Sequence, residues 1–194
     1  MRPHLVLIAG PNGAGKSTLF ETRIAPEFVG PFINADIIQR DELRDTSMQA
    51  SYKAAEMAKD RRDKLLNAGR SFATETVFSH PSKLEIIKTA RARGYIVLVM
   101  HVGVDSPDLS VGRVKYRTRY GGHNVPEQKI RERYVRGMPL IREAILMADT
   151  GMVYDNSKPD ASPRRMLIFT NGTLVRAQPA LPGWILQGYA RDLI

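Results

Sequence analysis

One short motif, at residues 10–17, constrains the fold of this chain more than any other feature. Its sequence is Gly-Pro-Asn-Gly-Ala-Gly-Lys-Ser, which fits the phosphate-loop pattern G-x-x-x-x-G-K-[ST] at every specified position. An apolar run at residues 4–9 leads directly into it, as in a strand covered on both faces of a parallel sheet. A helix is expected to begin near Lys16. This order of strand, loop and helix predicts an α/β fold.

The residue types in this loop suit the binding of a nucleotide. Glycines let backbone N–H groups point at phosphates, and the helix that follows adds the positive end of its dipole. We expect Lys16 against the β- and γ-phosphates of ATP, and the hydroxyl of Ser17 on a Mg²⁺ ion. The expected nucleotide-binding residues are Gly10, Pro11, Asn12, Gly13, Ala14, Gly15, Lys16, Ser17 and Thr18. ATP and Mg²⁺ are therefore the predicted cofactors.

Apolar and helical stretches alternate through most of the remaining chain. Further strands are expected at residues 31–35, 71–77, 95–102 and 151–154. Helices are expected between them, one capped by Ser47 and one with Pro81 in its first turn. This alternation predicts a kinase-like P-loop NTPase, a three-layer sandwich around a mostly parallel sheet. A C-terminal β-hairpin is predicted at residues 165–177, because Asn171-Gly172 is a favoured hairpin turn.

A lid over the nucleotide is expected at residues 106–136, within one P-loop domain that spans residues 1–194. The window around Ser110 is interpreted as the cap of a basic helix. A glycine-containing break follows at residues 120–126, and a hinge there would let the lid close. Two helices are expected after the break, interrupted around residues 137–139.

Basic residues exceed acidic ones by 29 to 20, a net charge of +9, which indicates an anionic partner. Nine of the basic residues and three acidic ones lie in residues 111–143, so this segment carries +6 of the +9. Arginines on a hinged lid can stabilise a phosphoryl group in transfer, although any one of them could be a solvated surface charge. Of the arginines that flank the break, we assign Arg119 and Arg131 to catalysis and keep Arg133 as a further candidate.

Two carboxylates end predicted strands, at the edge of the sheet where ligands of α/β proteins gather. Asp36 could accept the proton of an attacking hydroxyl, or it could cap the helix that follows. Glu75 and Thr76 close the next strand. Glu75 could orient a substrate or hold Mg²⁺ through water, or it could be an exposed charge on an edge strand.

Several classes of protein are excluded or disfavoured. The chain has no cysteine, so it has no disulfide, thiolate zinc site or cysteine nucleophile. The first apolar run is too short for a signal peptide or a membrane span, and we expect a cytoplasmic protein. Residues 109–113 resemble an ABC signature only loosely and residues 156–160 a guanine motif only faintly, and we interpret both as coincidence. Residues 178–194 have no predicted structure.

Four motifs occur in a specific order, at residues 9–18, 33–36, 73–76 and 119–134. Together they resemble the zeta toxin family of P-loop kinases, especially its short bacterial members, which are also labelled predicted ABC-type ATPases. The resemblance covers most of the chain. Zeta toxins phosphorylate the 3′-hydroxyl of the sugar in UDP-N-acetylglucosamine with ATP and Mg²⁺, and a cognate antitoxin blocks their nucleotide site.

The resemblance implies roles for individual residues. Lys16 would bind phosphates, Asp36 would be the base, and Glu75 with Thr76 would touch the acceptor. Better-known toxins have an arginine just before the position of Val125, where this chain has Gly-Gly-His-Asn. The family arginine therefore has no direct counterpart here.

Two functions from different classes follow. The leading hypothesis is an ATP-dependent small-molecule kinase that acts on a hydroxyl of a nucleotide-sugar-like acceptor, as a toxin that an antitoxin would control. The alternative is a nucleic-acid-binding P-loop ATPase, in which the basic segment follows a phosphate backbone. Few aromatic side chains interleave with those charges, namely Tyr116, Tyr120 and Tyr134, and stacking platforms usually need more. We therefore expect small molecules as partners, and neither nucleic acid nor a membrane.

Overall fold

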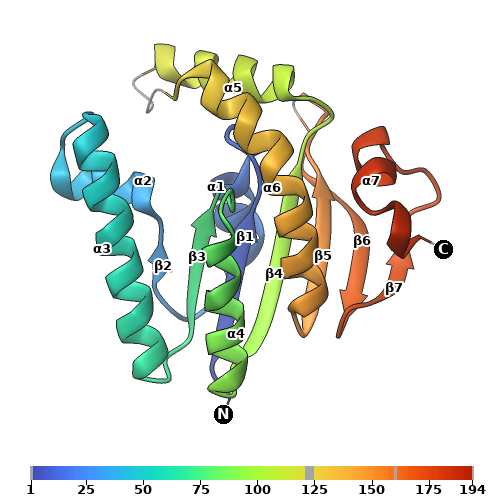
Figure 1. Ribbon diagram of the computed structural model, residues 1–194, viewed down its shortest axis with the longest axis horizontal. Helices are drawn as coiled ribbons and strands as arrows, with labels where there is room; N and C mark the ends of the chain where they lie inside the picture. Colours follow the sequence, from blue (N-terminus) through green and yellow to red (C-terminus); the bar gives the residue numbers. More distant parts are fainter. Residues whose placement is uncertain (1, 121–124, 160, 194) are drawn as a thin grey trace.

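The computed structural model describes residues 2–120, 125–159 and 161–193. Within them, seven strands form one sheet in the order β2-β3-β1-β4-β5-β6-β7 (Figure 1). The strands are β1 His4–Ala9, β2 Phe32–Ile33, β3 Phe72–Thr76, β4 Ile96–Gly103, β5 Thr150–Asp155, β6 Arg164–Thr170 and β7 Thr173–Ala177. The first five are parallel, and β6 and β7 are antiparallel. The predicted mostly parallel sheet with a C-terminal hairpin is confirmed.

Helices cover both faces of this sheet and make the three predicted layers. They are α1 Lys16–Leu19, α2 Ala35–Ile37, α3 Met48–Asn67, α4 Leu84–Ala92, α5 Pro107–Arg119, α6 Glu127–Met147 and α7 Gly183–Gly188. In the view of Figure 1, α3, α4 and α6 lie in front of the sheet and α1 lies behind it, while α5 crosses above its edge. The carboxyl ends of the parallel strands therefore face α5 and the loop before α1.

Strand β1 shows why the two faces need cover. Leu5 and Leu7 point into the core beneath α3, α4 and α6, whereas Val6 and Ile8 point into the core that α1 closes. All four side chains are at most 4% exposed. A strand that is apolar at successive positions is stable only when water is excluded from both sides, which is what the apolar run predicted.

Local capping signals place several helix ends as expected. The Ser47 hydroxyl accepts a hydrogen bond from the N–H of Ala50, 3.1 Å away, at the start of α3. Pro81 opens a 3-10 turn, Pro81–Lys83, that leads into α4. The hairpin turn at Asn171-Gly172 joins β6 to β7 as predicted.

Two helix predictions were wrong. The cap of α5 is Ser106, whose hydroxyl accepts from the N–H of Leu109 at 3.2 Å, while Ser110 lies buried inside the helix. Past residue 126 there is one helix, α6, which continues through Pro139. Proline removes the hydrogen bond to the carbonyl of Val135, but both residues are exposed, so water can satisfy that carbonyl. The central residues of the predicted hinge, 121–124, lie outside the described part of the chain.

Residues near the C-terminus, which had no predicted structure, form α7 and pack on the same face as α6. Trp184 and Tyr189 are at most 5% exposed and belong to the larger core. The prolines and glycines of this segment obscured any periodic pattern in the sequence, and the core against which its two aromatic side chains pack is formed by distant parts of the chain.

Candidate active site

The phosphate loop lies between the end of β1 and the start of α1. Gly15 has a φ of 88°, in the left-handed region that favours glycine, and a side chain there would collide with the amide nitrogen of Asn156. The side chain of Lys16 is 6% exposed, and its Nζ donates to the carbonyl of Pro11 at 3.0 Å. The loop thus has the tight turn and the inward lysine that the motif predicts.

Helix α5, which begins the predicted lid, packs directly against this loop. A Cβ at Gly13 would lie 2.8 Å from the carbonyl oxygen of Ser110 and 3.2 Å from the Cβ of Arg113. Glycine is therefore required for the close approach. The buried hydroxyl of Ser110 has no hydrogen-bond partner among the described residues.

Glu75 connects three parts of the site. One carboxylate oxygen accepts from the hydroxyl of Ser17 at 2.7 Å and from the amide of Asn34 at 3.1 Å, and the other lies 3.6 Å from Nζ of Lys16. Strand β3 lies between β2 and β1, and the Glu75 side chain is 10% exposed, so the alternative of an exposed charge on an edge strand is wrong. The Glu75 carboxylate therefore lies beside the two residues, Lys16 and Ser17, that end the phosphate-loop motif.

Asp36 lies two residues after Asn34, in the short helix α2. The cap of that helix is Asn34, whose side-chain oxygen accepts from the backbone N–H of Asp36 at 2.8 Å. The alternative in which Asp36 is itself the cap is therefore wrong. Its side chain is exposed and lines a groove that begins at the phosphate loop.

This groove has a volume of about 440 Å³ and lies between α3 and α4, above β1 and β3. Asn12, Asn34 and Glu75 line its phosphate-loop end, and Thr76 lies on its floor. Directly beyond, the buried Phe78 has a φ of 57°, and its N–H donates to the Thr76 hydroxyl at 3.2 Å. A bulky residue in the left-handed region is strained, and such strain occurs preferentially at functional sites.

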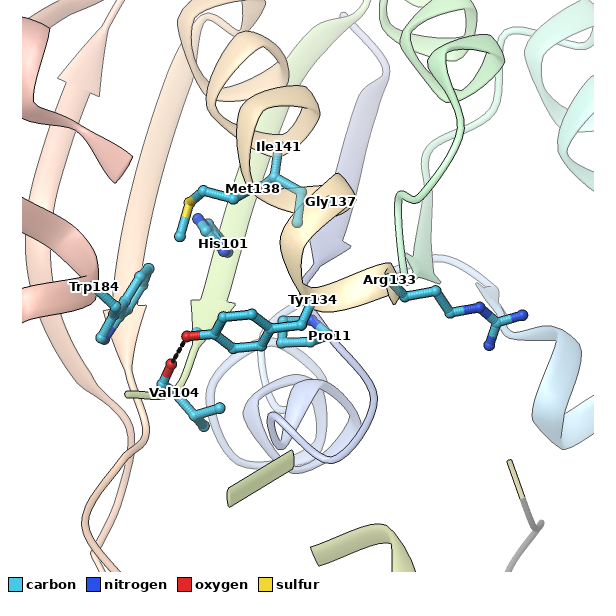
Figure 2. A pocket seen from close by; sticks show the side chains of 10 residues that line it. Pro11, His101, Val104, Arg133, Tyr134, Gly137, Met138, Ile141 and Trp184 are labelled. Carbon is cyan, nitrogen blue, oxygen red and sulfur yellow. Dashed lines mark hydrogen bonds between the residues drawn. The ribbon is translucent and has the colours of Figure 1, made fainter. Parts of the chain in front are cut away.

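Arg133 is the arginine of α6 that reaches the groove. Its guanidinium donates to the side-chain oxygen of Asn12 at 3.4 Å, and it lines the groove. Figure 2 shows Arg133 and Tyr134 leaving α6 on opposite sides of Pro11, with Tyr134 donating to the carbonyl of Val104 at 2.6 Å. Burial raises the pKa of Tyr134 to about 12, so this phenol remains a hydrogen-bond donor that fixes α6 beside the loop.

The two arginines assigned to catalysis lie elsewhere. Arg131 forms ion pairs with Asp108 at 2.6 Å and with Glu127 at 2.8 Å. Arg119 ends α5 and is exposed. Neither is among the described residues that line the groove.

A second contact holds the phosphate loop from the side of β5. Asn156 donates through its side-chain amide to the carbonyl of Ala14 at 2.8 Å. The residue before it, Asp155, accepts from the indole nitrogen of Trp184 at 2.9 Å and from the hydroxyl of Ser157 at 2.5 Å. Helix α7 thus holds the end of β5 through Trp184, and Asn156, the next residue, holds the phosphate loop.

Beside this contact is a cavity of only about 10 Å³ (Figure 2). His101 lines it, fully buried, with Nδ1 2.8 Å from the hydroxyl of Tyr189. Burial lowers the pKa of His101 to about 3, so the imidazole is neutral. The cavity is too small for a substrate, and we assign His101 to packing.

The sequence model of the zeta toxin family matches residues 1–158, which is more than half of the chain. The chain belongs to the zeta toxin family. An uncharacterized protein of Haemophilus influenzae is 26% identical to it over 134 residues, which are 69% of this chain and 94% of that protein.

Solved structures share the fold of this zeta toxin family member. The AvrRxo1-ORF1:-ORF2 complex with ATP gives a TM-score of 0.69 at 13% identity over 98% of this chain, which spans 63% of that chain. The PezAT toxin-antitoxin system of Streptococcus pneumoniae gives 0.60 at 18% identity, over 84% of this chain and 70% of that one. A putative kinase from Chloroflexus aurantiacus gives 0.55 at 21% identity, over 70% of this chain and 79% of that one.

These comparisons confirm two of the predictions. The fold is that of a P-loop kinase, and membership of the zeta toxin family makes the protein a phosphotransferase. Among the described residues, no helix has the length and apolar character needed to cross a membrane.

The donor set of the zeta toxin site suits ATP with Mg²⁺. Mg²⁺ prefers hard oxygen ligands and is usually held by one or two protein groups together with nucleotide phosphates. The hydroxyl of Ser17 and the carboxylate of Glu75 supply such oxygens 2.7 Å apart, next to Lys16. Thr18 is exposed on the outer side of α1, so the hydroxyl of Ser17 is the one that faces this position.

Two residues of this site carried no assigned role in the sequence, and a third was only a candidate. Asn34 lies within one of the family motifs, and Asn156 lies within the segment that we interpreted as a coincidental guanine motif. Arg133 lies two positions from the arginine chosen for catalysis. Asn34 and Asn156 each follow a strand directly, and this position could have indicated them. The carboxyl ends of neighbouring parallel strands meet at one edge of the sheet, where ligands bind.

Proposed function

We propose that this zeta toxin family member transfers the γ-phosphoryl group of MgATP to a hydroxyl of a nucleotide-sugar-like acceptor. UDP-N-acetylglucosamine is the acceptor that the family resemblance implies. The observation that carries the proposal is the continuity of the phosphate loop with the groove, since Asn12 of the loop lines the groove and Glu75, which also lines it, accepts a hydrogen bond from Ser17 of the loop. The groove volume of about 440 Å³ is within the range of small-molecule sites.

Asp36 is the proposed general base. Its exposed carboxylate accepts the proton of the acceptor hydroxyl while that oxygen attacks the γ-phosphorus. The bond between the γ-phosphorus and the bridging oxygen of ATP breaks, and ADP leaves with that electron pair. Thr76, with Glu75, is proposed to touch the acceptor, because both line the groove on its β3 side.

Positive charge around the phosphates stabilises the transfer. Lys16 is proposed on the β- and γ-phosphates, and Arg133, already at the loop through Asn12, on the transferred group. Arg119 and Arg131 remain candidates that would first have to move, and Arg131 would have to leave both its carboxylate partners. We propose residues 106–136 as a lid on one domain of residues 1–194.

Ser17 and Glu75 would hold the Mg²⁺ ion, Glu75 directly or through water. The ion would offset the charge of the ATP phosphates. The two side chains hydrogen bond to each other at 2.7 Å, so their oxygens are close enough to contact the same ion.

A protein antitoxin is the proposed partner. The support is family membership, together with a structural neighbour that is a toxin-antitoxin system. If such a partner exists, co-expression with it restores the growth of cells that are inhibited by this chain.

The function is tested by incubating the purified protein with MgATP and UDP-N-acetylglucosamine and identifying the phosphorylated sugar by mass spectrometry. Asp36→Asn is expected to lower the rate about 10²- to 10⁴-fold. Asp41→Asn is the matched control, because Asp41 is an exposed carboxylate that pairs with the exposed Arg40, and it should retain the wild-type rate. Transfer by Asp36→Asn at the wild-type rate would remove Asp36 as the base.

A further inference from the structure

The groove continues past Asp36 between α3 and α4, and two cationic side chains line that part. Arg62 comes from the second half of α3 and Lys83 from the turn that leads into α4, and both line the groove. Both side chains are partly buried. Their charges act on each other, because the charge of Arg62 contributes to lowering the pKa of Lys83.

The neighbouring carboxylates are already engaged. Asp63 pairs with Lys59 at 2.7 Å, and Glu85 pairs with Lys88 at 2.8 Å. In residues 2–120, 125–159 and 161–193, neither Arg62 nor Lys83 has a carboxylate within 4.0 Å.

Burial disfavours the charged forms of both Arg62 and Lys83. The pKa of Arg62 and that of Lys83 are each lowered chiefly by loss of solvent, and the raising effect of Asp63 on Arg62 is smaller. Two like charges that are partly removed from water destabilise the free protein. Such an arrangement is typical of a position where a ligand supplies the missing opposite charge.

We propose that Arg62 and Lys83 form an anion subsite that binds a phosphoryl group of the acceptor. A guanidinium can donate two parallel hydrogen bonds to phosphoryl oxygens, and an ammonium adds a compact charge. This subsite rests on the proposed function for its biological meaning, because it sets the class of acceptor: a molecule with its reactive hydroxyl at Asp36 and a phosphate further along the groove. Acceptors without an anionic group are then poor substrates.

The direct test is binding of inorganic pyrophosphate to the intact protein while the phosphate loop is filled by a non-hydrolysable MgATP analogue. Calorimetry should detect saturable binding that Arg62→Gln and Lys83→Met each weaken about tenfold or more. Arg61→Gln is the matched control, because Arg61 is the adjacent residue of α3 and pairs with Glu42 at 2.5 Å. Absence of binding, or equal binding by all three variants, overturns the subsite.

A second readout needs no ligand. Lys83→Met keeps the apolar stem and removes the charge beside Arg62, so it should raise the Tm of the free protein by about 1–3 °C. Lys88→Met removes a paired, exposed charge and should not raise the Tm. A loss of stability in Lys83→Met would mean that Lys83 has a stabilising partner, contrary to the proposal.

The outcomes separate this subsite from the proposed function. Pyrophosphate binding that depends on Arg62 and Lys83, without phosphorylation of UDP-N-acetylglucosamine, retains the subsite and rejects that acceptor. Transfer to N-acetylglucosamine with the same kcat/KM as to its UDP derivative retains the kinase and rejects the subsite.

Discussion

The basic segment, residues 111–143, and the wall of the groove hold positive charge in opposite ways. Within the segment, hydrogen bonds to Glu127 raise the pKa of Arg131, and hydrogen bonds to Asp192 raise that of Arg142. In the groove wall, burial lowers the pKa of Arg62 and of Lys83. In this chain, therefore, charge density along the sequence does not separate ion-paired arginines from the cations of the proposed subsite, whereas burial and the absence of a carboxylate partner among the described residues do.

Within α6, Arg131 and Arg133 show a similar contrast between an ion-paired arginine and one that faces the groove. Arg131 is engaged by Asp108 and Glu127, whereas Arg133 contacts the phosphate loop through Asn12. On a helix these positions differ by about 200° in direction, so one faces α5 and the other faces the groove.

The largest expected effect separates these two arginines. Arg133→Gln should lower kcat for phosphoryl transfer about 100-fold or more, because it removes a charge beside the transferred group. Arg131→Gln should change kcat less than about threefold, since it removes exposed ion pairs. Steady-state kinetics measure both. A larger loss of kcat in Arg131→Gln than in Arg133→Gln would mean that the lid rearranges and that Arg131, not Arg133, acts on the transferred group.

A smaller effect is expected from breaking an ion pair of the basic segment. Asp192→Asn leaves Arg142 without the carboxylate that it contacts at 2.6 Å through Nε, and both side chains are mostly buried. We expect a loss of about 2 kcal/mol in the free energy of unfolding, measured by urea denaturation. Lys88→Gln, which breaks an exposed pair, should cost under about 0.5 kcal/mol, and equal losses would contradict the argument from burial.

The opposite flank of the phosphate loop gives the next prediction. Asn156→Ala removes the hydrogen bond to Ala14 and should raise the KM for ATP about tenfold, because the loop loses one of its fixed contacts. Its kcat should change little. Asn67→Ala, at the exposed end of α3, is the control and should leave the KM for ATP unchanged. An unchanged KM in Asn156→Ala would show that the other contacts of the loop hold it without Asn156.

The smallest expected effect concerns nucleic acid. Because part of the basic segment is ion-paired, we expect a short DNA duplex to bind no tighter than about 10 μM at about 150 mM salt. A gel-shift titration over salt concentration measures this. Tight binding with a steep dependence on salt would favour the alternative of a nucleic-acid-binding ATPase and would make the basic segment the functional surface.

Local patterns explain which features of this protein could be read from the chain. The turn at Gly15, the position of Lys16 and the burial of β1 depend on residues within a few positions of one another. The cap at Ser47 and the hairpin at Asn171 are similarly local. The prediction of a cap near Ser110 was wrong because Ser106 offered the same chemistry one turn earlier, and the break at Pro139 was wrong because packing of α6 outweighs one lost hydrogen bond.

The sequence by itself determined that this chain builds a phosphate loop on a parallel sheet, since glycine spacing, a lysine and an apolar run suffice for that. Tertiary structure alone decided which distant residues serve the loop. Glu75 reaches Ser17 because β3 lies beside β1, and Asn156 reaches Ala14 because it follows β5 at the same edge of the sheet. Arg62 and Lys83 line one groove because α3 and the turn before α4 flank it. Contacts of this kind depend on strand order and helix direction, which no short stretch of sequence encodes.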